Sequence, residues 1–293
     1  MIKLSILVAS KNQSKFIPDL LSALDQQTFQ DFELVVVDSF SSDGSIDLFK
    51  SYKKTRLFLR DCSANDAYLF ALKNALGKYV MLATTSDHLY SEKWIENSIR
   101  ALELDPSLSL VWGSAVNINE SGVLRGVWGE HFLHDHPPSK FNYLPYWLFN
   151  PYLPELNFVV RSEVYKYCLS KQVNLDYMYV FMLNFTKYGF LQKYIPDLAH
   201  AGRSHPGSLT IKNRFHDFNQ FYILLRKHQL IYFFKVILGA KKHIFRDGQM
   251  RKIKDLSLDQ KMLMPIIILK ILITEFPKAL LRKIVRLVKL KRD

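Results

Sequence analysis

The chain has 293 residues, of which 48% are hydrophobic, and a formal net charge of +13. This length can bury a substantial core, as one large domain or as one domain with an appendage. The chain has two cysteines, Cys62 and Cys168, which exclude a disulfide framework or a cysteine-based zinc site and favour a reducing compartment. It has no run of about 18 apolar residues, which predicts that it does not span a membrane.

Short apolar runs alternate with helical patterns through the first part of the chain. Strands are predicted over residues 4–9, 32–37, 57–59, 79–83 and 108–116, and helices over 16–24, from 46, over 66–76 and over 92–104. The amino terminus is too short for a signal peptide and has the pattern of a first strand. Uninterrupted alternation of this kind predicts an α/β fold, with a parallel sheet covered by helices on both faces.

Polar or acidic residues follow the predicted strands of this region, at Ser10, Asp38, Asp61 and Asp87. In open α/β sheets ligands bind at this edge, where a carboxylate can accept a hydrogen bond from a base or ribose or can hold a divalent cation. Each residue taken alone could instead form a turn or cap a helix, as Asp87 could for the helix near Glu92. No Gly-x-Gly-x-x-Gly or Walker loop follows any strand, which counts against dinucleotide oxidoreductases and P-loop enzymes.

Several segments together resemble the family 2 glycosyltransferases of the GT-A fold. They are residues 8–12, 26–38 and 41–45, Asp61 with Asp66 and Ala67, and residues 77–80. The resemblance is strong over residues 1–120 and looser over 155–210. It implies a Rossmann-like, mostly parallel sheet and a nucleotide-sugar site in which Ala9 and Ser10 touch the nucleotide. By the same resemblance Asp38 holds the base, most often uracil, and Asp61 lies beside the base and ribose.

The resemblance also implies a site for a divalent metal, Mg or Mn. Asp87 matches the last aspartate of the family's Asp-x-Asp motif, but Thr85 stands at the position of the first. One carboxylate and one hydroxyl are a weak set of ligands, so metal binding is expected to depend on the donor diphosphate, unless Thr85 donates a hydrogen bond to a phosphate instead.

Residues 200–210 resemble the loop that follows the base helix in the family. Arg203 and His205 within this run are suited to the diphosphate or to a remaining metal position. If His205 reaches the cation, it partly offsets the missing aspartate. A purely structural role for both residues is the alternative.

The acceptor side is expected in the next part of the chain. Residues 128–154 contain a His-x-x-His-Asp-His run among many aromatics, which we interpret as a surface loop over the acceptor site rather than as a metal cluster. Glu155 and Asn157 are candidate acceptor residues by resemblance, with a structural role as the alternative. Asp176, at the start of a helix, matches the family's general base, which an inverting transfer requires, although it could also be a helix N-cap.

All of the excess positive charge lies at the carboxyl end. Residues 212–293 carry 20 Lys and Arg against 6 Asp and Glu, whereas residues 1–211 carry 20 against 21. Basic and apolar side chains separate onto different helical faces, which predicts amphipathic helices lying on an anionic bilayer. Packing of these helices against the catalytic domain is the alternative, and nucleic-acid binding is a third interpretation that lacks any recognition module.

These patterns predict a GT-A domain over 1–211, with a nucleotide-sugar half (1–120) and an acceptor half (121–211), and a basic amphipathic helical tail over 212–293. The expected function is inverting transfer of a sugar from a nucleoside diphosphate, UDP by resemblance, to a cell-surface glycan or lipid-linked acceptor. The expected setting is bacterial polysaccharide biosynthesis, peripheral at the inner face of the cell membrane, without nucleic acid. The alternative is a non-catalytic relative that binds nucleotide sugar or serves as a membrane scaffold, with a degraded Asp-x-Asp motif.

Overall fold

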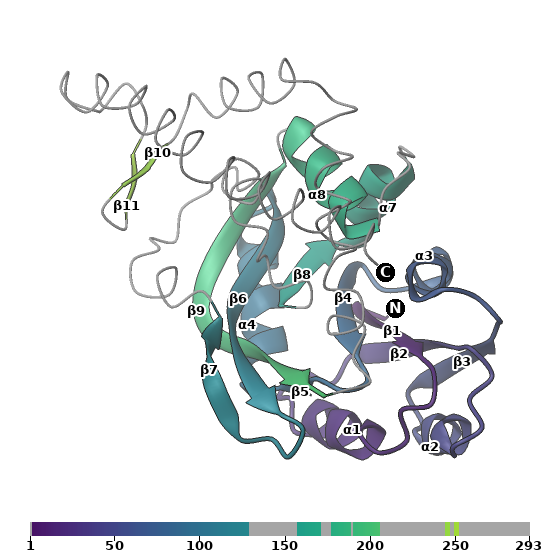
Figure 1. Ribbon diagram of the computed structural model, residues 1–293. Coiled ribbons are helices and arrows are strands. Elements are labelled where there is room, and N and C mark those ends of the chain that lie inside the picture. Colours follow the sequence, from purple (N-terminus) through teal and green to yellow (C-terminus); the bar gives the residue numbers. More distant parts are fainter. Residues whose placement is uncertain are drawn as a thin grey trace, which may run out of the picture.

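The computed structural model describes residues 2–128, 157–170, 177–188, 190–205, 244–246 and 249–251. The strands are β1 (Leu4–Ser10), β2 (Phe32–Asp38), β3 (Thr55–Leu59), β4 (Tyr79–Thr84), β5 (His88–Leu89), β6 (Leu108–Asn119), β7 (Leu124–Trp128), β8 (Phe158–Arg161), β9 (Leu191–Ser204), β10 (Ile244–Arg246) and β11 (Gln249–Arg251). The helices are α1 (Ile17–Asp25), α2 (Ser45–Ser51), α3 (Ala64–Asn74), α4 (Trp94–Leu104), α7 (Ser162–Ser170) and α8 (Tyr177–Lys187). Figure 1 shows their arrangement.

Nine strands form one twisted sheet in the order β3-β2-β1-β4-β8-β6-β9-β5, with β7 paired to β6 (Figure 1). The strands β1, β2, β3 and β4 are parallel to one another, as the strand and helix alternation predicted. Beyond β4 the sheet is mixed: β8 runs antiparallel to both β4 and β6, whereas β6 and β9 are parallel. Strands from the predicted nucleotide half and the predicted acceptor half therefore share one sheet.

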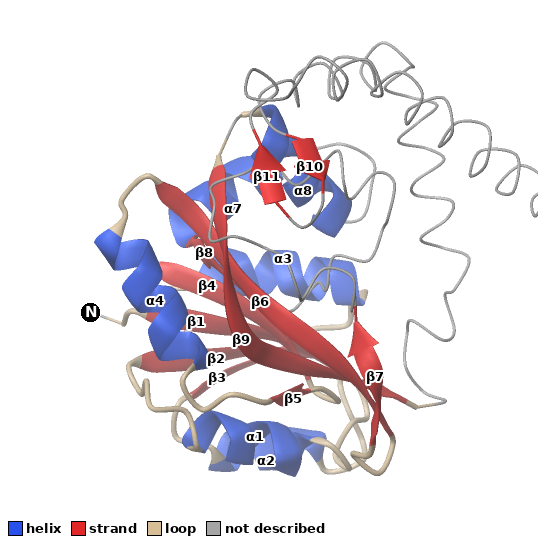
Figure 2. Cartoon of the chain, turned by 90° about the vertical axis from the view of Figure 1, so that its left-hand side faces the viewer, coloured by secondary structure: helices blue, strands red, loops and turns tan. Residues whose placement is uncertain are grey.

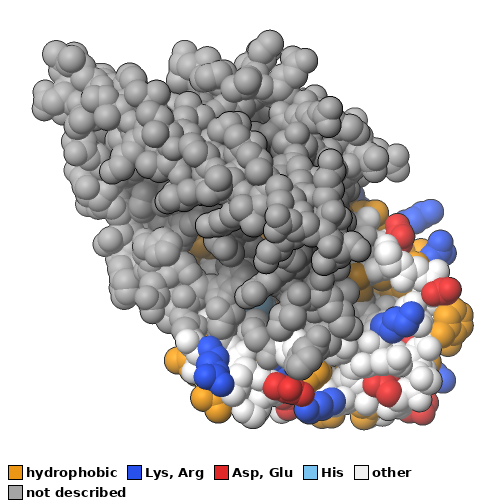
Figure 3. Space-filling view, viewed as in Figure 1, with side chains coloured by type: hydrophobic (Ala, Val, Ile, Leu, Met, Phe, Trp, Pro, Cys, Tyr) orange, Lys and Arg blue, Asp and Glu red, His pale blue; other side chains and the backbone are white. Residues whose placement is uncertain are grey.

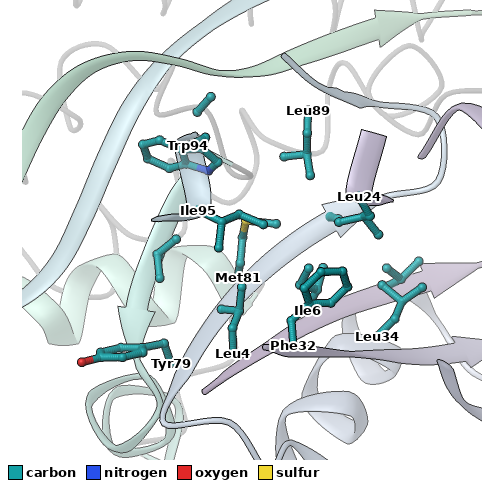
Figure 4. Close-up of a cluster of buried hydrophobic side chains, with 14 of the residues drawn as sticks. Leu4, Ile6, Leu24, Phe32, Leu34, Tyr79, Met81, Leu89, Trp94 and Ile95 are labelled. Atoms are coloured by element: carbon teal, nitrogen blue, oxygen red, sulfur yellow. The ribbon is translucent and has the colours of Figure 1, made fainter. Parts of the chain in front are cut away.

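Alternating side chains of the central strands supply two separate cores, because successive residues of a strand point to opposite faces. One face carries Leu4, Ile6 and Val8 of β1 and meets α1, α2 and α4. Figure 4 shows part of this core, where Met81 of β4 lies near Ile95 of α4 and Ile6 of β1.

The opposite face is covered by α3, α7 and α8, so that the sheet lies between two helical layers (Figure 2). Leu7 of β1 and Leu82 of β4 point into this second core. Phe181 of α8 stacks on Phe158 with ring centroids 5.6 Å apart, and meets Tyr165 of α7 at 4.6 Å. Aromatic packing therefore attaches α7 and α8 to the sheet.

A buried carboxylate joins several elements at the amino-terminal edge of the sheet. Glu33 of β2, only 3% exposed, accepts hydrogen bonds from the Ser5 hydroxyl at 2.5 Å, from the Leu76 N–H at 2.8 Å and from the Arg56 guanidinium at 2.7 Å. Beside it the chain passes so close to β1 that a Cβ on Gly77 would lie 2.4 Å from the Ser5 nitrogen. The amino-terminal edge of the sheet is thus filled by protein contacts, and the carboxyl-terminal edge is the place to look for a ligand site.

Two predictions are corrected by the structure. Residues 200–204, expected in a loop, form the end of the 14-residue strand β9, because their backbone pairs with both β6 and β5. Within the predicted helical tail, Ile244–Arg246 and Gln249–Arg251 pair as antiparallel strands, so these six residues are not helical. The other helices predicted for the tail lie outside the described residues.

The surface of the described residues carries charges of both signs. Figure 3 shows Lys and Arg side chains interspersed with Asp and Glu over the described part of the face in view, in agreement with the nearly balanced charge of residues 1–211. Among the helices that the structure describes, none has the length and apolar character needed to cross a bilayer.

Candidate active site

The carboxyl ends of β1, β2, β3 and β4 meet at one edge of the sheet. Ser10 lies opposite Asp38, Asp38 opposite Leu59, and Ala9 opposite Thr84 in the strand registers. The backbone continues this alignment past the strands, since the Ser39 N–H donates to the Ser10 carbonyl at 2.9 Å. The parallel register therefore places Ser10 beside Asp38, and Asp61 and Asp87 follow strands that end at the same edge.

Asp38 is completely buried and its carboxylate turns back onto its own loop. One oxygen accepts from the Ser41 N–H and the other from the Ser41 hydroxyl, each at 2.7 Å. Asp61 is exposed and accepts a bond of 3.3 Å from the Ser39 hydroxyl. Ser10 is 6% exposed, and its hydroxyl has no hydrogen-bond partner among the described residues. A buried polar group without a partner needs an explanation, and a bound ligand is one.

The loops after β1 and β2 are tied to each other. The Asn12 N–H donates to the Ser41 hydroxyl at 2.8 Å, and the Ser14 N–H donates to Asp43 at 2.8 Å. Burial opposes the ionisation of Asp43, but hydrogen bonds from Ser45 and Ser14 outweigh it and lower its pKa to about 2. A carboxylate that stays ionised at neutral pH therefore holds the two loops together.

Asp87 follows β4 and is held from both sides by β9. One carboxylate oxygen lies 2.8 Å from His200 Nε2, and the other accepts from the Arg203 N–H at 2.9 Å. Burial alone would raise the pKa of Asp87. The charge and hydrogen bond of His200, with the bond from Arg203, outweigh burial and hold that pKa below its ordinary value. Asp87 is thus an anion whose two oxygens are both oriented.

The Arg203 side chain joins elements that are far apart in the sequence. Its three guanidinium nitrogens donate to the Ser86 carbonyl at 2.8 Å, the Glu120 carbonyl at 2.8 Å and the Asp19 carboxylate at 2.9 Å. The guanidinium carbon also lies 5.3 Å from the Phe16 ring centroid. The sequence predicted Arg203 at the diphosphate or at a remaining metal position, with a structural role as the alternative. Its described contacts connect the Asp87 loop, the β6–β7 turn and α1.

His205 lies at the end of this group and is 7% exposed. Its ring centroid is 4.7 Å from that of Phe16, and burial lowers its pKa, so that the neutral imidazole is favoured. Burial likewise lowers the pKa of His88 on β5. A neutral imidazole can supply a lone pair to a cation or a hydrogen bond to a phosphate.

The residues at the Asp87 loop fit a cation that arrives with its own ligands. Within the described residues, no three His, Cys, Asp or Glu side chains form a group that could hold a metal ion. Asp87 nevertheless keeps further lone pairs on its two oxygens, and Thr85, two positions earlier in the chain, is 4% exposed. Magnesium is usually bound by one or two carboxylates together with substrate phosphates and water, which this set of donors can match.

Of the predicted acceptor and general-base residues, the structure describes Asn157 alone. Asn157 is completely buried, and its side-chain amide donates to the Gly113 carbonyl, between β8 and β6. Glu155 and Asp176 lie outside the described residues. The described chain resumes at Tyr177, whose N–H donates to the Asn65 side chain at 2.9 Å, beside the first turn of α3. The start of α8 is therefore attached to the helix that follows Asp61.

Sequence reasoning assigned no role to His200 or Asp19. Each contacts a residue more than a hundred positions away, His200 with Asp87 and Asp19 with Arg203, and neither belongs to a short motif. The signal available in the sequence was weak: His200 precedes Arg203 by three positions in a run already compared with the family.

Residues 5–153, about half of the chain, match the family model described as Glycosyl transferase family 2. The poly(ribitol-phosphate) beta-N-acetylglucosaminyltransferase TarS of Staphylococcus aureus is 32% identical over 100 residues, which are 31% of this chain and 18% of TarS. The poly(ribitol-phosphate) beta-glucosyltransferase of Bacillus spizizenii is 27% identical over 137 residues, 44% of this chain and 21% of that protein. The chain spans about a fifth of these curated relatives.

Solved structures show the same fold. The crystal structure of S. aureus TarS with UDP-GlcNAc superposes with a TM-score of 0.62 at 16% identity, covering 82% of this chain and 72% of that one. The mannosyltransferase PcManGT of Pyrobaculum calidifontis, with GDP-Man and Mn²⁺, gives a TM-score of 0.59 at 18% identity and covers 81% and 68%. These neighbours confirm the expected α/β fold of the GT-A type.

Proposed function

This chain belongs to glycosyl transferase family 2, and from that premise we propose that it transfers a sugar, with inversion, from a UDP-sugar to a hydroxyl of a cell-surface polymer. The observation that carries the proposal is the meeting of Ser10, Asp38, Asp61 and Asp87 at one edge of the sheet. We propose that residues 1–211 form the transferase unit and that residues 212–293 form an appendage.

The donor's nucleotide is assigned to the ends of β1, β2 and β3. Asp38 is fixed by Ser41 and keeps lone pairs that can accept the N–H of a uracil ring. The Ser10 hydroxyl is buried at the same edge, next to Ala9, and can bond to the ligand. Asp61 is exposed two residues beyond β3 and can accept from a ribose hydroxyl. UDP is favoured because carboxylates accept from uracil and because TarS was solved with UDP-GlcNAc.

The diphosphate is assigned to the loop after β4. Asp87, with the Thr85 hydroxyl, would hold a divalent cation whose other ligands are diphosphate oxygens and water, and such a cation neutralises charge on the departing diphosphate. His205 can bond to the diphosphate through its neutral imidazole. Arg203 is proposed to support this site indirectly, because its described hydrogen bonds hold the Asp87 loop in place and go to protein groups.

Asp176 is proposed as the general base. An inverting transfer is a single in-line displacement, so the acceptor hydroxyl must lose its proton as it attacks from the face opposite the diphosphate. Support comes from the neighbouring residue, since Tyr177 is bonded to Asn65 and its ring lies 5.2 Å from that of Tyr68, whose hydroxyl donates to the Ala83 carbonyl at the end of β4. The start of α8 thereby lies on the side of the sheet edge where the donor is expected.

The acceptor is proposed to be an anionic, polyol-containing glycopolymer of the cell surface, or its lipid-linked precursor. Both curated relatives are named for poly(ribitol-phosphate) acceptors and beta products. Glu155 remains a proposed acceptor residue. Asn157 is also proposed as an acceptor residue: its side-chain NH₂ group bonds to the Gly113 carbonyl, and its side-chain Oδ1 has no partner among the described residues.

Calorimetric titration with UDP, GDP, CDP and dTDP, each with and without Mn²⁺, tests the donor assignment. We expect UDP to bind most tightly and Mn²⁺ to strengthen binding. Asp38→Ala should weaken UDP binding by about 5- to 150-fold, since a lost bond to a buried acceptor costs roughly 1–3 kcal/mol. Asp47→Ala, an exposed aspartate on α2, is the matched control and should bind like the original chain. Equal, weak binding of all four nucleotides would exclude the proposed donor site.

The second candidate is a binding protein that has lost transfer activity. Two observations favour it: Thr85 replaces an expected carboxylate, and both oxygens of Asp87 already accept hydrogen bonds. Donor hydrolysis or transfer separates the two candidates, because only the enzyme should turn over UDP-sugars and lose that turnover in Asp176→Asn with donor binding intact. Binding without turnover, across a broad set of acceptors, would favour the second candidate.

A further inference from the structure

We propose that His200 is a positioning residue for Asp87, holding its carboxylate so that the remaining lone pairs face the cation and diphosphate of the donor. The inference rests on the proposed function and assigns a role to a side chain that no short motif identified.

The pairing of β5 with β9 creates this arrangement. His88 lies opposite Ala201 and Leu89 opposite His200, so Asp87, immediately before β5, lies beside the end of β9. His200 Nε2 reaches one Asp87 oxygen at 2.8 Å, and the Arg203 N–H reaches the other at 2.9 Å. Two donors on opposite oxygens prevent the carboxylate from rotating about its last torsion angle. One of these donors is backbone, so His200 is the side chain that can be changed.

The His200 imidazole is committed to this single bond. Ionised Asp87 can only accept, so Nε2 carries the hydrogen that lies between the two groups. The other ring nitrogen, Nδ1, is buried and has no partner among the described residues. A histidine that served packing alone would not need a nitrogen directed at a carboxylate 113 positions away.

Arg203 holds the loop while His200 holds the carboxylate. The guanidinium bonds to the Ser86 carbonyl, which fixes the backbone on the amino side of Asp87, and to Asp19 of α1. With both the backbone and the side chain fixed, Asp87 is oriented before any ligand arrives. Carboxylates that ligate metals are themselves hydrogen-bonded in this way, and removing such a partner typically weakens metal binding or activity by roughly 10- to 100-fold.

Two substitutions separate the hydrogen bond from the packing of the ring. His200→Gln keeps a donor near the Nε2 position and loses the ring, whereas His200→Phe keeps a ring of similar size and loses the donor. Mn²⁺ binding to the UDP-loaded chain would be followed by electron paramagnetic resonance of free Mn²⁺, alongside UDP binding without metal and thermal unfolding.

We expect His200→Phe to weaken Mn²⁺ binding by about 10- to 100-fold, and His200→Gln to recover most of that loss. The Kd for UDP without metal should change by less than about twofold, since Asp87 is proposed to act on the diphosphate through the cation. Transfer by His200→Phe should need more Mn²⁺ for half-maximal rate, and excess Mn²⁺ should restore part of kcat.

Equal Mn²⁺ affinity in the original chain and both variants would overturn the inference, as would a phenylalanine variant that performs as well as the glutamine variant. Failure of the proposed function looks different, because the unmodified chain would then bind neither UDP nor Mn²⁺ with UDP. If only the phenylalanine variant fails to fold, His200→Gln and His200→Asn form the deciding pair. Asparagine is too short to reach Asp87, so the asparagine variant is expected to lose Mn²⁺ affinity.

Discussion

The buried His205 and the half-buried His88 border the Asp87 loop, and burial is the largest influence on the pKa of each. Burial lowers the pKa of His88 and of His205, and the positive charge of Arg203 lowers both further, against the opposing charges of Asp19 near His88 and Glu120 near His205. The neutral imidazole is therefore the form that the folded chain favours for each.

This predicts a loss of stability as the pH falls below about 6.5, the ordinary histidine pKa. The unfolded chain binds more protons than the folded chain in that range, so the free energy of unfolding is greatest above pH 6.5 and decreases toward pH 5. The pKa values of Asp43 and Asp87 are depressed, so the stability that their ionised forms contribute is lost only below about pH 4. A change in stability between pH 5 and 6.5 therefore reports on histidines and not on these two carboxylates.

Urea unfolding at pH 8, 6.5 and 5 would measure this dependence. His205→Gln should flatten the decline, because the side chain that resists protonation is gone. A free energy of unfolding that stays constant or rises from pH 8 to pH 5 would contradict the prediction.

Among the elements, β9 does most to complete the site. The first four parallel strands bring Ser10, Asp38 and Asp61 together, but Asp87 is oriented only because β9 pairs with β6 along most of its length and with β5 at its end. Extension of the strand through Ser204 carries Arg203 into contact with α1 and with the β6–β7 turn. The proposed transfer site at this edge therefore depends on an element more than a hundred residues away from the strands that carry the motifs.

At the opposite edge, Glu33 connects β1, β2, β3 and the segment before β4. We predict that Glu33→Gln destabilises the fold by about 2–4 kcal/mol, because removing one partner of a buried pair leaves the Arg56 charge without its counter-ion and disturbs the Leu76 bond. The Arg56 guanidinium is partly exposed and can be hydrated again in the variant, so the loss of unfolding free energy is expected near the lower end of this range.

Urea denaturation of this variant beside Glu103→Gln provides the measurement. Glu103 pairs with Lys3 at 3.1 Å on the surface, where an ion pair is worth about 0–1 kcal/mol. Similar midpoints for both variants would show that the Glu33 network contributes little.

At the scale of the whole molecule, residues 1–211 are nearly neutral in charge, whereas residues 212–293 are strongly basic. We propose that residues 212–293 bring the protein to an anionic membrane surface, where lipid-linked precursors of cell-surface polymers are found. The proposal rests on 20 basic against 6 acidic residues in that segment and on the separation of Arg282 and Arg286 from Leu281 and Val285 by helical spacing.

Vesicle flotation of the full chain should show binding to vesicles rich in phosphatidylglycerol and little binding to pure phosphatidylcholine. Adding about 0.5 M salt should release the chain, since screening shortens the range of surface charge. The double substitution of Arg282→Glu and Arg286→Glu should weaken binding, with donor binding unchanged. Equal binding to both kinds of vesicle would exclude an electrostatic attachment.

The sequence by itself determined the layered α/β architecture, the order and approximate bounds of most elements through β6, and the set of strand-end residues. It could do so because strand and helix periodicities are local, and because parallel strands necessarily end at a common edge. The motifs carrying Asp38, Asp61 and Asp87 are local in the same sense, and the family match confirms the family that they indicated.

Only the tertiary structure decided that residues 200–204 form a strand, that His200 and Arg203 orient Asp87, and that Asn157 bonds to Gly113 inside the sheet. These features depend on pairing between segments far apart in the chain, and no local period or spacing encodes which strand will lie beside which. A polar residue in a short run has the same local pattern whether it faces a ligand or a distant backbone carbonyl. The sequence identifies which groups are available, and packing determines which of them remain available to a ligand.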